Sequence, residues 1–169
     1  MKKIYLYLYI LFNLLLICGC SKTEENTSKT ESNSISRTIS CYNETYLFKS
    51  KKSVEHILSI SKGNHLVQYE SIEKYFDFTD FDDFNMICDG SSEEAENNNK
   101  LYPYLKEVAD CNRDSMQVTI SDVYDISKLE SKNNIPTDLV KDALNDQFLI
   151  DIDSFKTNIM NKGYVCVDR

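Results

Sequence analysis

The sequence predicts a single α+β domain in which an antiparallel sheet carries helices packed on one face. Several segments alternate apolar and polar residues at every second position, which is the pattern of half-buried strands. Other segments repeat apolar residues at helical spacing. The 169 residues, of which 41% are hydrophobic and 27% charged, fit one soluble domain of ordinary size. Strands, a helix, a strand and further helices in that order give the α+β class, and we assign residues 37–169 to this domain.

The domain is predicted to begin with a strand and a β-hairpin. Residues 37–41 (RTISC) form the entering strand, and residues 54–61 (VEHILSIS) alternate with a period of two. Gly63 and Asn64 suit a two-residue hairpin loop, after which residues 65–78 continue as a long strand rich in aromatic and branched side chains. The predicted facing pairs are Ile60 with Val67, Leu58 with Tyr69, and His56 with Ser71.

The middle of the chain predicts two helices separated by a polar stretch. Phe81, Phe84 and Cys88 lie on one helical face and indicate the first helix. Residues 89–100 are polar and acidic, and we expect a loop or a frayed helix there. Pro103 suits the first turn of a second helix, because a missing N–H is harmless in that position. The buried stripe of this second helix would be Tyr104, Leu105, Val108 and Cys111.

The last third of the domain predicts a strand, two helices and a closing strand. Residues 115–126 alternate as a half-buried strand does. Thr137 can cap the next helix, and Asp151 or Asp153 can cap the last one. The first of these helices would carry Leu139, Val140, Ala143, Leu144 and Phe148, and Gly163 would end the second before a short strand over residues 164–166.

The N-terminus has the pattern of a cleaved signal peptide over residues 1–19. Lys2 and Lys3 give a positive start, and residues 4–17 are an almost unbroken apolar run. At about 14 residues this run is short for a membrane span, which needs about 20. The alternatives are an uncleaved signal anchor and a secreted protein that is cut elsewhere.

The residues that follow the apolar run, Ile17-Cys18-Gly19-Cys20, resemble the lipobox of bacterial lipoproteins. This resemblance implies that a diacylglycerol is attached to the thiol of Cys20 and that the leader is cut just before it. The protein would then be anchored in the cell membrane by its N-terminal lipid, with the domain on the extracytoplasmic face. Residues 20–36 would be the lipidated cysteine and a flexible linker, because this stretch has almost no apolar side chain to bury.

Four of the six cysteines lie in the domain, and an even number in an exported domain favours disulfides. Of the three possible connectivities we favour Cys41–Cys166, which joins the opening strand to the closing one, together with Cys88–Cys111. Four buried thiols are the alternative. Zinc is disfavoured because the sequence has no C-x-x-C pair with a nearby His.

The remaining candidate motifs are weak. The acidic cluster of residues 77–83 fits carboxylates at the positive end of a helix, and its spacing does not match a calcium-binding EF-hand loop. Ser71 and Lys74 match the S-x-x-K acyl-enzyme motif, but they fall in a predicted strand without partner motifs. The strands also carry many tyrosines, which suit either surface recognition or core packing.

Taken together, the order of these features resembles small lipoproteins of low-GC Gram-positive bacteria, similar to the YehR-like lipoprotein family. The features are the lipobox, the polar spacer, a strand with a cysteine, the hairpin, a strand ending in Asp-Ile-Ser-Lys-Leu, and the terminal Gly-Tyr-x-Cys. The resemblance implies a fold and a location, and it carries no activity.

Composition narrows the classes of function. The net charge of −8 argues against a nucleic-acid partner, and the sequence gives no indication of a cofactor or a metal site. We therefore expect a non-catalytic binding or structural accessory module that recognises a protein or an envelope polymer through its sheet. The alternative is an extracytoplasmic enzyme or folding helper that acts on exported proteins. A pocket with convergent titratable groups would favour the alternative.

Overall fold

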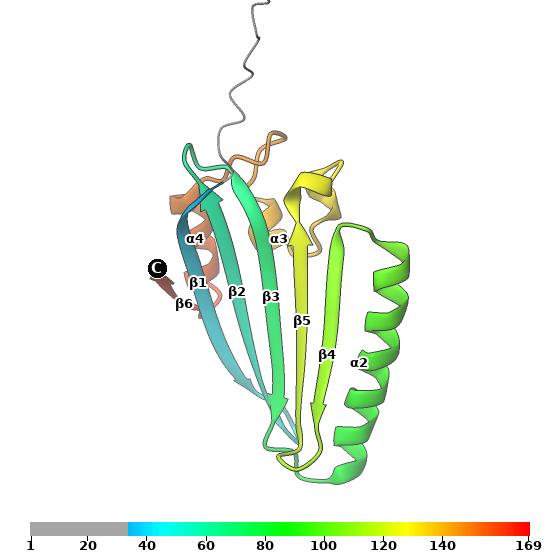
Figure 1. Ribbon diagram of the computed structural model, residues 1–169. Helices are drawn as coiled ribbons and strands as arrows, with labels where there is room; N and C mark the ends of the chain where they lie inside the picture. Colours follow the sequence, from blue (N-terminus) through cyan, green and yellow to red (C-terminus); the bar gives the residue numbers. More distant parts are fainter. Residues whose placement is uncertain (1–33) are drawn as a thin grey trace, which may run out of the picture. The chain divides into compact units, whose positions relative to one another are not determined.

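The computed structural model describes residues 34–169, which lie in one compact unit (Figure 1). The predicted signal peptide, Cys20 and the linker as far as residue 33 lie outside the described residues. The first strand begins at Ile35, so Ile35 and Ser36, which the sequence analysis placed in the linker, belong to the sheet.

The core element is a six-stranded antiparallel sheet with the strand order β4-β5-β3-β2-β1-β6 (Figure 1). Three long strands run as a meander in the middle, the hairpin of β4 and β5 adds to β3, and the short β6 closes the other edge against β1. The strands are β1 (Ile35–Tyr46), β2 (Lys51–Ser61), β3 (Leu66–Phe76), β4 (Leu105–Asn112), β5 (Gln117–Asp125) and β6 (Val165–Asp168).

The helices pack on one face of the sheet in two groups, as predicted for the α+β class. The long α2 (Phe81–Leu101) lies along β4, near one edge of the sheet. The short elements and α4 form the second group on the same face, toward the edge formed by β1 and β6 (Figure 1). The shorter elements are the 3₁₀ helices η1 (Ile126–Lys128) and η2 (Lys132–Asn134) and the helices α3 (Asp138–Lys141) and α4 (Ile152–Met160). Each group has its own apolar cluster, one around Phe155 and Tyr69 and one around Phe84 and Val118.

The predicted hairpin is confirmed with one change of register. Leu58 pairs with Tyr69 and His56 with Ser71, as expected. Ile60 pairs with Leu66 instead of Val67, because a β-bulge between Ser59 and Ile60 shifts the pairing near the turn. Gly63 and Asn64 both have positive φ (87° and 64°), which is the backbone conformation that glycine and asparagine favour in tight turns.

The prediction for the middle of the chain was wrong in two places. Residues 89–100 continue α2 without interruption, because small side chains at Ser91 and Ala95 extend the buried stripe that begins with Phe84. Residues 105–112, predicted as a helix, form β4. The spacing of Leu105, Val108 and Cys111 fits a helix, but the inward side of the strand is the alternating series of Leu105, Glu107, Ala109 and Cys111.

The predicted N-caps of the two helices in the last third of the chain are confirmed, whereas the first of these helices is shorter than predicted. The Thr137 side chain accepts from the Leu139 N–H at 3.3 Å, and the Asp151 side chain accepts from the Ser154 N–H at 3.0 Å. Gly163 follows α4 with a φ of 87°. The helix after Thr137 stops at Lys141, so that Leu144 and Phe148 lie in the following turns.

Both predicted disulfides are present. Cys41–Cys166 joins the directly opposite residues of β1 and β6, and Cys88–Cys111 joins α2 to β4. Each bond therefore ties an edge strand of the sheet to a neighbouring element.

Removal of the disulfides should destabilise the domain by an amount that grows with the logarithm of the length of the loop that each one closes. For the sequence separation of 23 between Cys88 and Cys111, a double Cys→Ala variant should lose about 3 kcal/mol of unfolding free energy. For the separation of 125 between Cys41 and Cys166, the corresponding loss should be about 5 kcal/mol. Urea unfolding measures both. A loss below about 1 kcal/mol in either double variant would contradict this account.

Candidate functional site

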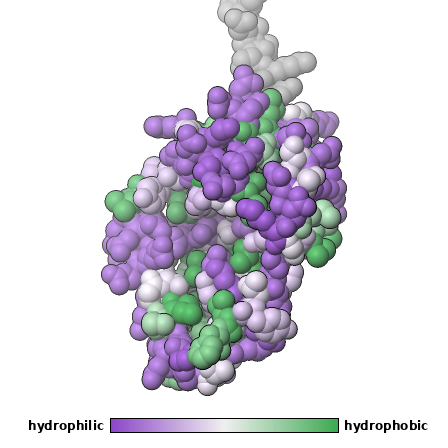
Figure 2. All heavy atoms as spheres, turned by 180° about the vertical axis from the view of Figure 1, so that it is seen from behind, coloured by the Kyte–Doolittle hydropathy of each residue, from purple (hydrophilic) through white to green (hydrophobic). Residues whose placement is uncertain are grey.

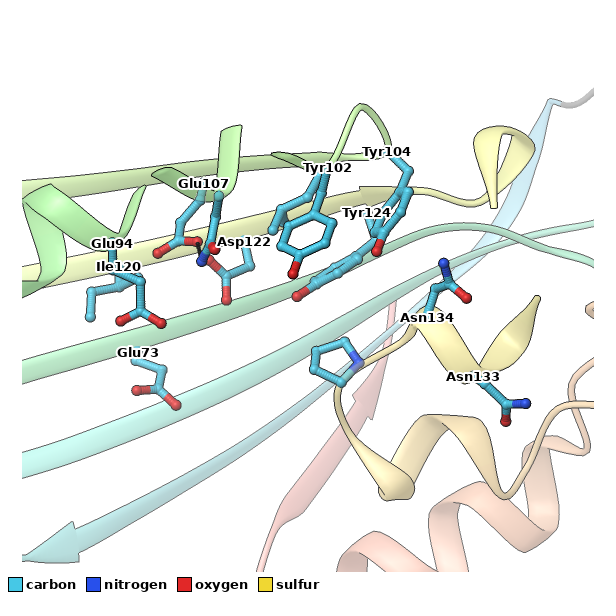
Figure 3. A pocket seen from close by; sticks show the side chains of 13 residues that line it. Glu73, Glu94, Tyr102, Tyr104, Glu107, Ile120, Asp122, Tyr124, Asn133 and Asn134 are labelled. Atoms are coloured by element: carbon cyan, nitrogen blue, oxygen red, sulfur yellow. Dashed lines mark hydrogen bonds between the residues drawn. The ribbon is translucent and has the colours of Figure 1, made fainter. Parts of the chain in front are cut away.

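A cleft of about 530 Å³ opens on the helical face of the sheet, between α2 and the segment from η2 to α3. Figure 2, which views the molecule from the side opposite to Figure 1, shows a mainly hydrophilic face with a hollow near its middle. Figure 3 shows the side chains that line the cleft. They are Glu73, Glu94, Asn98, Tyr102, Tyr104, Leu105, Glu107, Ile120, Asp122, Tyr124, Asn133, Asn134 and Pro136.

The pairing register of the strands brings the floor of the cleft together. Asp122 of β5 lies between Glu107 of β4 and Ser71 of β3. Glu73, two residues after Ser71, points to the same face because side chains alternate along a strand. Glu94 comes from α2 and completes the set of four carboxylates in the lining. These carboxylates come from four different elements, of which α2, β4 and β5 are consecutive in the chain.

Glu107 is buried and held in a fixed position by the end of α2. Its side chain is only 6% exposed, and Asn98 Nδ2 donates to Glu107 Oε2 at 2.7 Å. The side chain of Asn99 makes two hydrogen bonds with the backbone of Glu107. Asn99 Nδ2 donates to the Glu107 carbonyl at 2.7 Å, and Asn99 Oδ1 accepts from the Glu107 N–H at 2.8 Å. Two consecutive asparagines therefore attach the helix to β4 and position this carboxylate.

Asp122 is the carboxylate with the least favourable surroundings. Its Oδ1 is buried and has no hydrogen-bond partner among residues 34–169. Burial, followed by the negative charges of Glu107, Glu73 and Glu94, raises the pKa of Asp122 to about 7. Near neutral pH this side chain therefore exists in both protonation states.

The other two carboxylates are easier to reach. Glu73 pairs with Lys52 at 2.7 Å and accepts from the hydroxyl of Tyr75 at 3.1 Å. Glu94 is exposed on α2, and within the described residues it makes no hydrogen bond or ion pair. The lining of the cleft contains no Lys or Arg, so its electrostatic potential is negative.

Three tyrosines also line the cleft, namely Tyr102, Tyr104 and Tyr124. The rings of Tyr102 and Tyr104 lie 5.7 Å apart, and Tyr124 stacks on Tyr69 with a centroid distance of 5.4 Å. Figure 3 shows the hydroxyls of Tyr102 and Tyr124 close together over the floor. Burial raises the pKa of Tyr124, so its phenol stays protonated.

A buried histidine lies next to the cleft and is connected to it through Tyr69. The Tyr69 hydroxyl and His56 Nδ1 share a hydrogen bond of 2.8 Å, and burial lowers the pKa of His56 to about 4. Ser71 lies between His56 and Asp122 in the register, so Ser, His and Asp form one row. No hydrogen bond joins these three side chains in the described structure, and the histidine is engaged by Tyr69. The row is therefore not an assembled catalytic triad.

The acidic cluster of residues 77–83 is not part of the cleft lining, and of the S-x-x-K motif only Ser71 lies beside the floor, next to Asp122. Asp80 caps α2 by accepting from the Asp83 N–H at 2.8 Å, and both carboxylates pair with Lys49. The prediction of a helix start is thus confirmed for the acidic cluster. Ser71 and Lys74 point to opposite faces of β3, because they are an odd number of residues apart. Among the described residues, no three His, Cys, Asp or Glu side chains are placed to hold a metal ion.

Sequence reasoning missed all four carboxylates of the cleft. Glu94 was assigned to a mobile loop and Glu107 to a helix. One signal was available in β5, where the inward positions read Val118, Ile120, Asp122 and Tyr124. A carboxylate on the apolar side of a strand is unusual and indicates a functional site or a buried ion pair.

Comparison of the chain with protein-family models, curated proteins and solved structures found no match. The resemblance to YehR-like lipoproteins therefore stays a prediction. No helix in the described part of the chain is long and apolar enough to cross a membrane.

The raised pKa of Asp122 gives a prediction about stability. Because its pKa in the folded state (about 7) lies above the ordinary value of 3.8, the folded state binds this proton more tightly than the unfolded state. Its contribution to stability therefore falls as the pH rises from about 4 to about 7. Asp122→Asn should raise the unfolding free energy at pH 8 by about 1 to 2 kcal/mol, a value reduced for solvent screening, and should change it little at pH 4.

Urea unfolding at the two pH values measures this difference, with the exposed Glu130→Gln as a control that should show none. Equal destabilisation of Asp122→Asn at both pH values would show that the carboxylate has a structural hydrogen bond instead.

Proposed function

We propose that this chain is a lipid-anchored extracytoplasmic binding protein and that the cleft on the helical face of the sheet is its ligand site. The observation that carries the proposal is the cleft itself, in which polar side chains from separate elements converge around a buried, unpartnered carboxylate oxygen. Such an oxygen costs free energy in the empty site, and a donor on a ligand would offset that cost.

The size and lining of the cleft support a small ligand or one end of a longer one. Its volume of about 530 Å³ falls in the range of about 300 to 1,000 Å³ that is typical of ligand pockets. Its lining is richer in acidic and amide side chains than that of a usual ligand pocket, which favours a polar or charged ligand. In this proposal the ligand binds to the helical side of the sheet, in the gap between the two groups of helices.

The proposed location rests on the N-terminal sequence and agrees with the cysteine chemistry. The positively charged start, the apolar run and the lipobox-like Cys20 together indicate a lipoprotein. All four cysteines of the described part are in disulfides, a state that is typical of oxidising, extracytoplasmic compartments.

The alternative function is an extracytoplasmic hydrolase, and the cleft meets the criterion given above for an enzyme, because titratable groups converge in it. Asp122, with its pKa raised to about 7, lies beside Glu107, and paired carboxylates of unequal pKa can act as acid and base. We favour binding because Glu107 is buried and its Oε2 accepts a hydrogen bond from Asn98, which limits its contact with a substrate or water. A folding helper that isomerises disulfides would need a free thiol, and residues 34–169 contain none.

The anchor can be tested by metabolic labelling with an alkyne analogue of palmitate. The wild-type chain should incorporate the label and fractionate with membranes, whereas Cys20→Ser should lose the label and remain a larger, unprocessed precursor. Cys18→Ser is the matched control and should behave as wild type. A native chain that is recovered from the cytosol with Met1 in place would overturn the proposed location.

The cleft can be tested with saturation-transfer NMR on the full chain in neutral detergent. We would screen amines, amino acids, dipeptides and short oligosaccharides. Asn134→Trp should fill the cleft and abolish the signal of any true ligand. Asn97→Trp, on the exposed surface of α2 and outside the lining, should keep it. Equal loss in both variants, or no ligand in any class, would overturn the proposed site.

A further inference from the structure

We propose that the ligand of the cleft is an organic molecule with at least two separated cationic amino groups. This inference rests on the proposed binding function and adds the chemical class of the ligand. It draws on three features of the cleft: its charge, the spread of that charge, and the arrangement of its tyrosines.

The charge of the lining is the first step. The lining contains four carboxylates and no basic side chain. Lys52 neutralises Glu73, whereas neither Glu94 nor Asp122 has a cationic partner among the described residues. At least two negative charges therefore face the cleft when Asp122 is ionised, and Glu107 adds a third. A neutral or anionic ligand would leave these charges without a counterpart.

The spread of the carboxylates is the second step. They belong to β3, β4, β5 and α2, and Figure 3 shows Glu107 beside Asp122 at one end of the group, Glu73 at the other end and Glu94 between them. No three of them are close enough to hold one metal ion, as noted above for the described residues. A single compact cation would therefore meet only part of the charge. A chain with cationic groups some distance apart can meet several carboxylates at once.

The tyrosines of the cleft can contact both the ammonium groups and the methylene chain of such a ligand. Aromatic faces attract ammonium groups and pack against methylene chains. The same contact already occurs within this protein, where Lys52 Nζ lies 5.1 Å from the centre of the Tyr75 ring. Tyr102 is 40% exposed and can receive a ligand from solvent, while Tyr124 is buried deeper in the cleft.

Asp122 gives an independent indication that a donor is missing. Its Oδ1 is shielded from water and has no hydrogen-bond partner. Within the described structure, no other oxygen of the four carboxylates is both buried to this extent and without a partner. An ammonium N–H would satisfy this oxygen. The titratable groups that face Asp122 from the surrounding elements are Glu107, Glu73, Glu94 and the Tyr124 hydroxyl. A cation bound among them would favour the ionised form of Asp122.

The experiment is isothermal titration calorimetry on the full chain in neutral detergent, with spermidine as the probe. We expect one spermidine per chain and no binding of its fully acetylated, neutral derivative. Glu94→Gln and Asp122→Asn should each weaken binding about tenfold, as expected for the loss of one charge-assisted hydrogen bond. Glu93→Gln removes the same charge from the neighbouring position of α2, outside the lining, and should leave the affinity within about twofold.

Two further readouts separate this site from general attraction of cations to an acidic protein. The affinity should rise between pH 5.5 and pH 8, and binding at pH 6 should release protons, because the ligand displaces the proton of Asp122. The Asp122→Asn variant should lose that proton release. A parallel titration with a Lys-Lys dipeptide shows whether a free polyamine or a basic peptide binds more tightly. Binding of either probe supports the proposal if Glu94→Gln and Asp122→Asn weaken it and Glu93→Gln does not.

Several results would overturn it. Equal weakening by Glu93→Gln and Glu94→Gln would mean diffuse attraction, and tight Ca²⁺ binding with the same dependence on Glu94 would mean a metal site. If neither cation binds but a neutral compound does and is blocked by Asn134→Trp, the ligand class is wrong and the binding cleft stands. If nothing is blocked by Asn134→Trp, both proposals fail.

Discussion

The register of β3 between β2 and β5 is the constraint on which the rest of the structure depends. A shift of one residue would turn every side chain of β3 to the other face of the sheet. In the observed register, Leu58, Tyr69 and Tyr124 form one row of the apolar core. The next row, through His56, Ser71 and Asp122, is polar and leads to Glu107 at the edge strand. The core and the cleft are thus neighbouring rows of the same sheet, and neither can move independently of the other.

The helices determine where this polar row is covered and where it is open. One group packs over Leu58 and Tyr69, and α2 packs over Val118 and is fixed to β4 by Cys88–Cys111 and by Asn98 and Asn99. The cleft lies between the two groups. Because both its wall and its floor are tied to β4, the site is held in shape before a ligand arrives, which limits the entropy lost on binding.

Local signals in the sequence were sufficient for much of the fold. The turn at Gly63 and Asn64, the caps at Thr137 and Asp151 and the pairing of cysteines each depend on a few neighbouring residues or on simple topology. The errors came where small or charged residues occupy buried positions. Ser91 and Ala95 continue the buried face of α2 without appearing apolar, and Glu107 interrupts the alternation of β4. The cleft could not be predicted because β4 was taken for a helix, which hid the pairing of Glu107 with Asp122, and because Glu73 joins them only through the longer-range pairing of β3 with β5.

The short β6 has a consequence for how the protein behaves in a reducing environment. It pairs with β1 only from Ile39 to Tyr42 and is fastened there by Cys41–Cys166. This strand covers the middle of the hydrogen-bonding edge of the 12-residue β1, and an uncovered edge is a template for other extended chains. The Cys41–Cys166 bond therefore holds β6 over this part of β1, and reduction of the bond would leave backbone pairing alone to keep that edge covered.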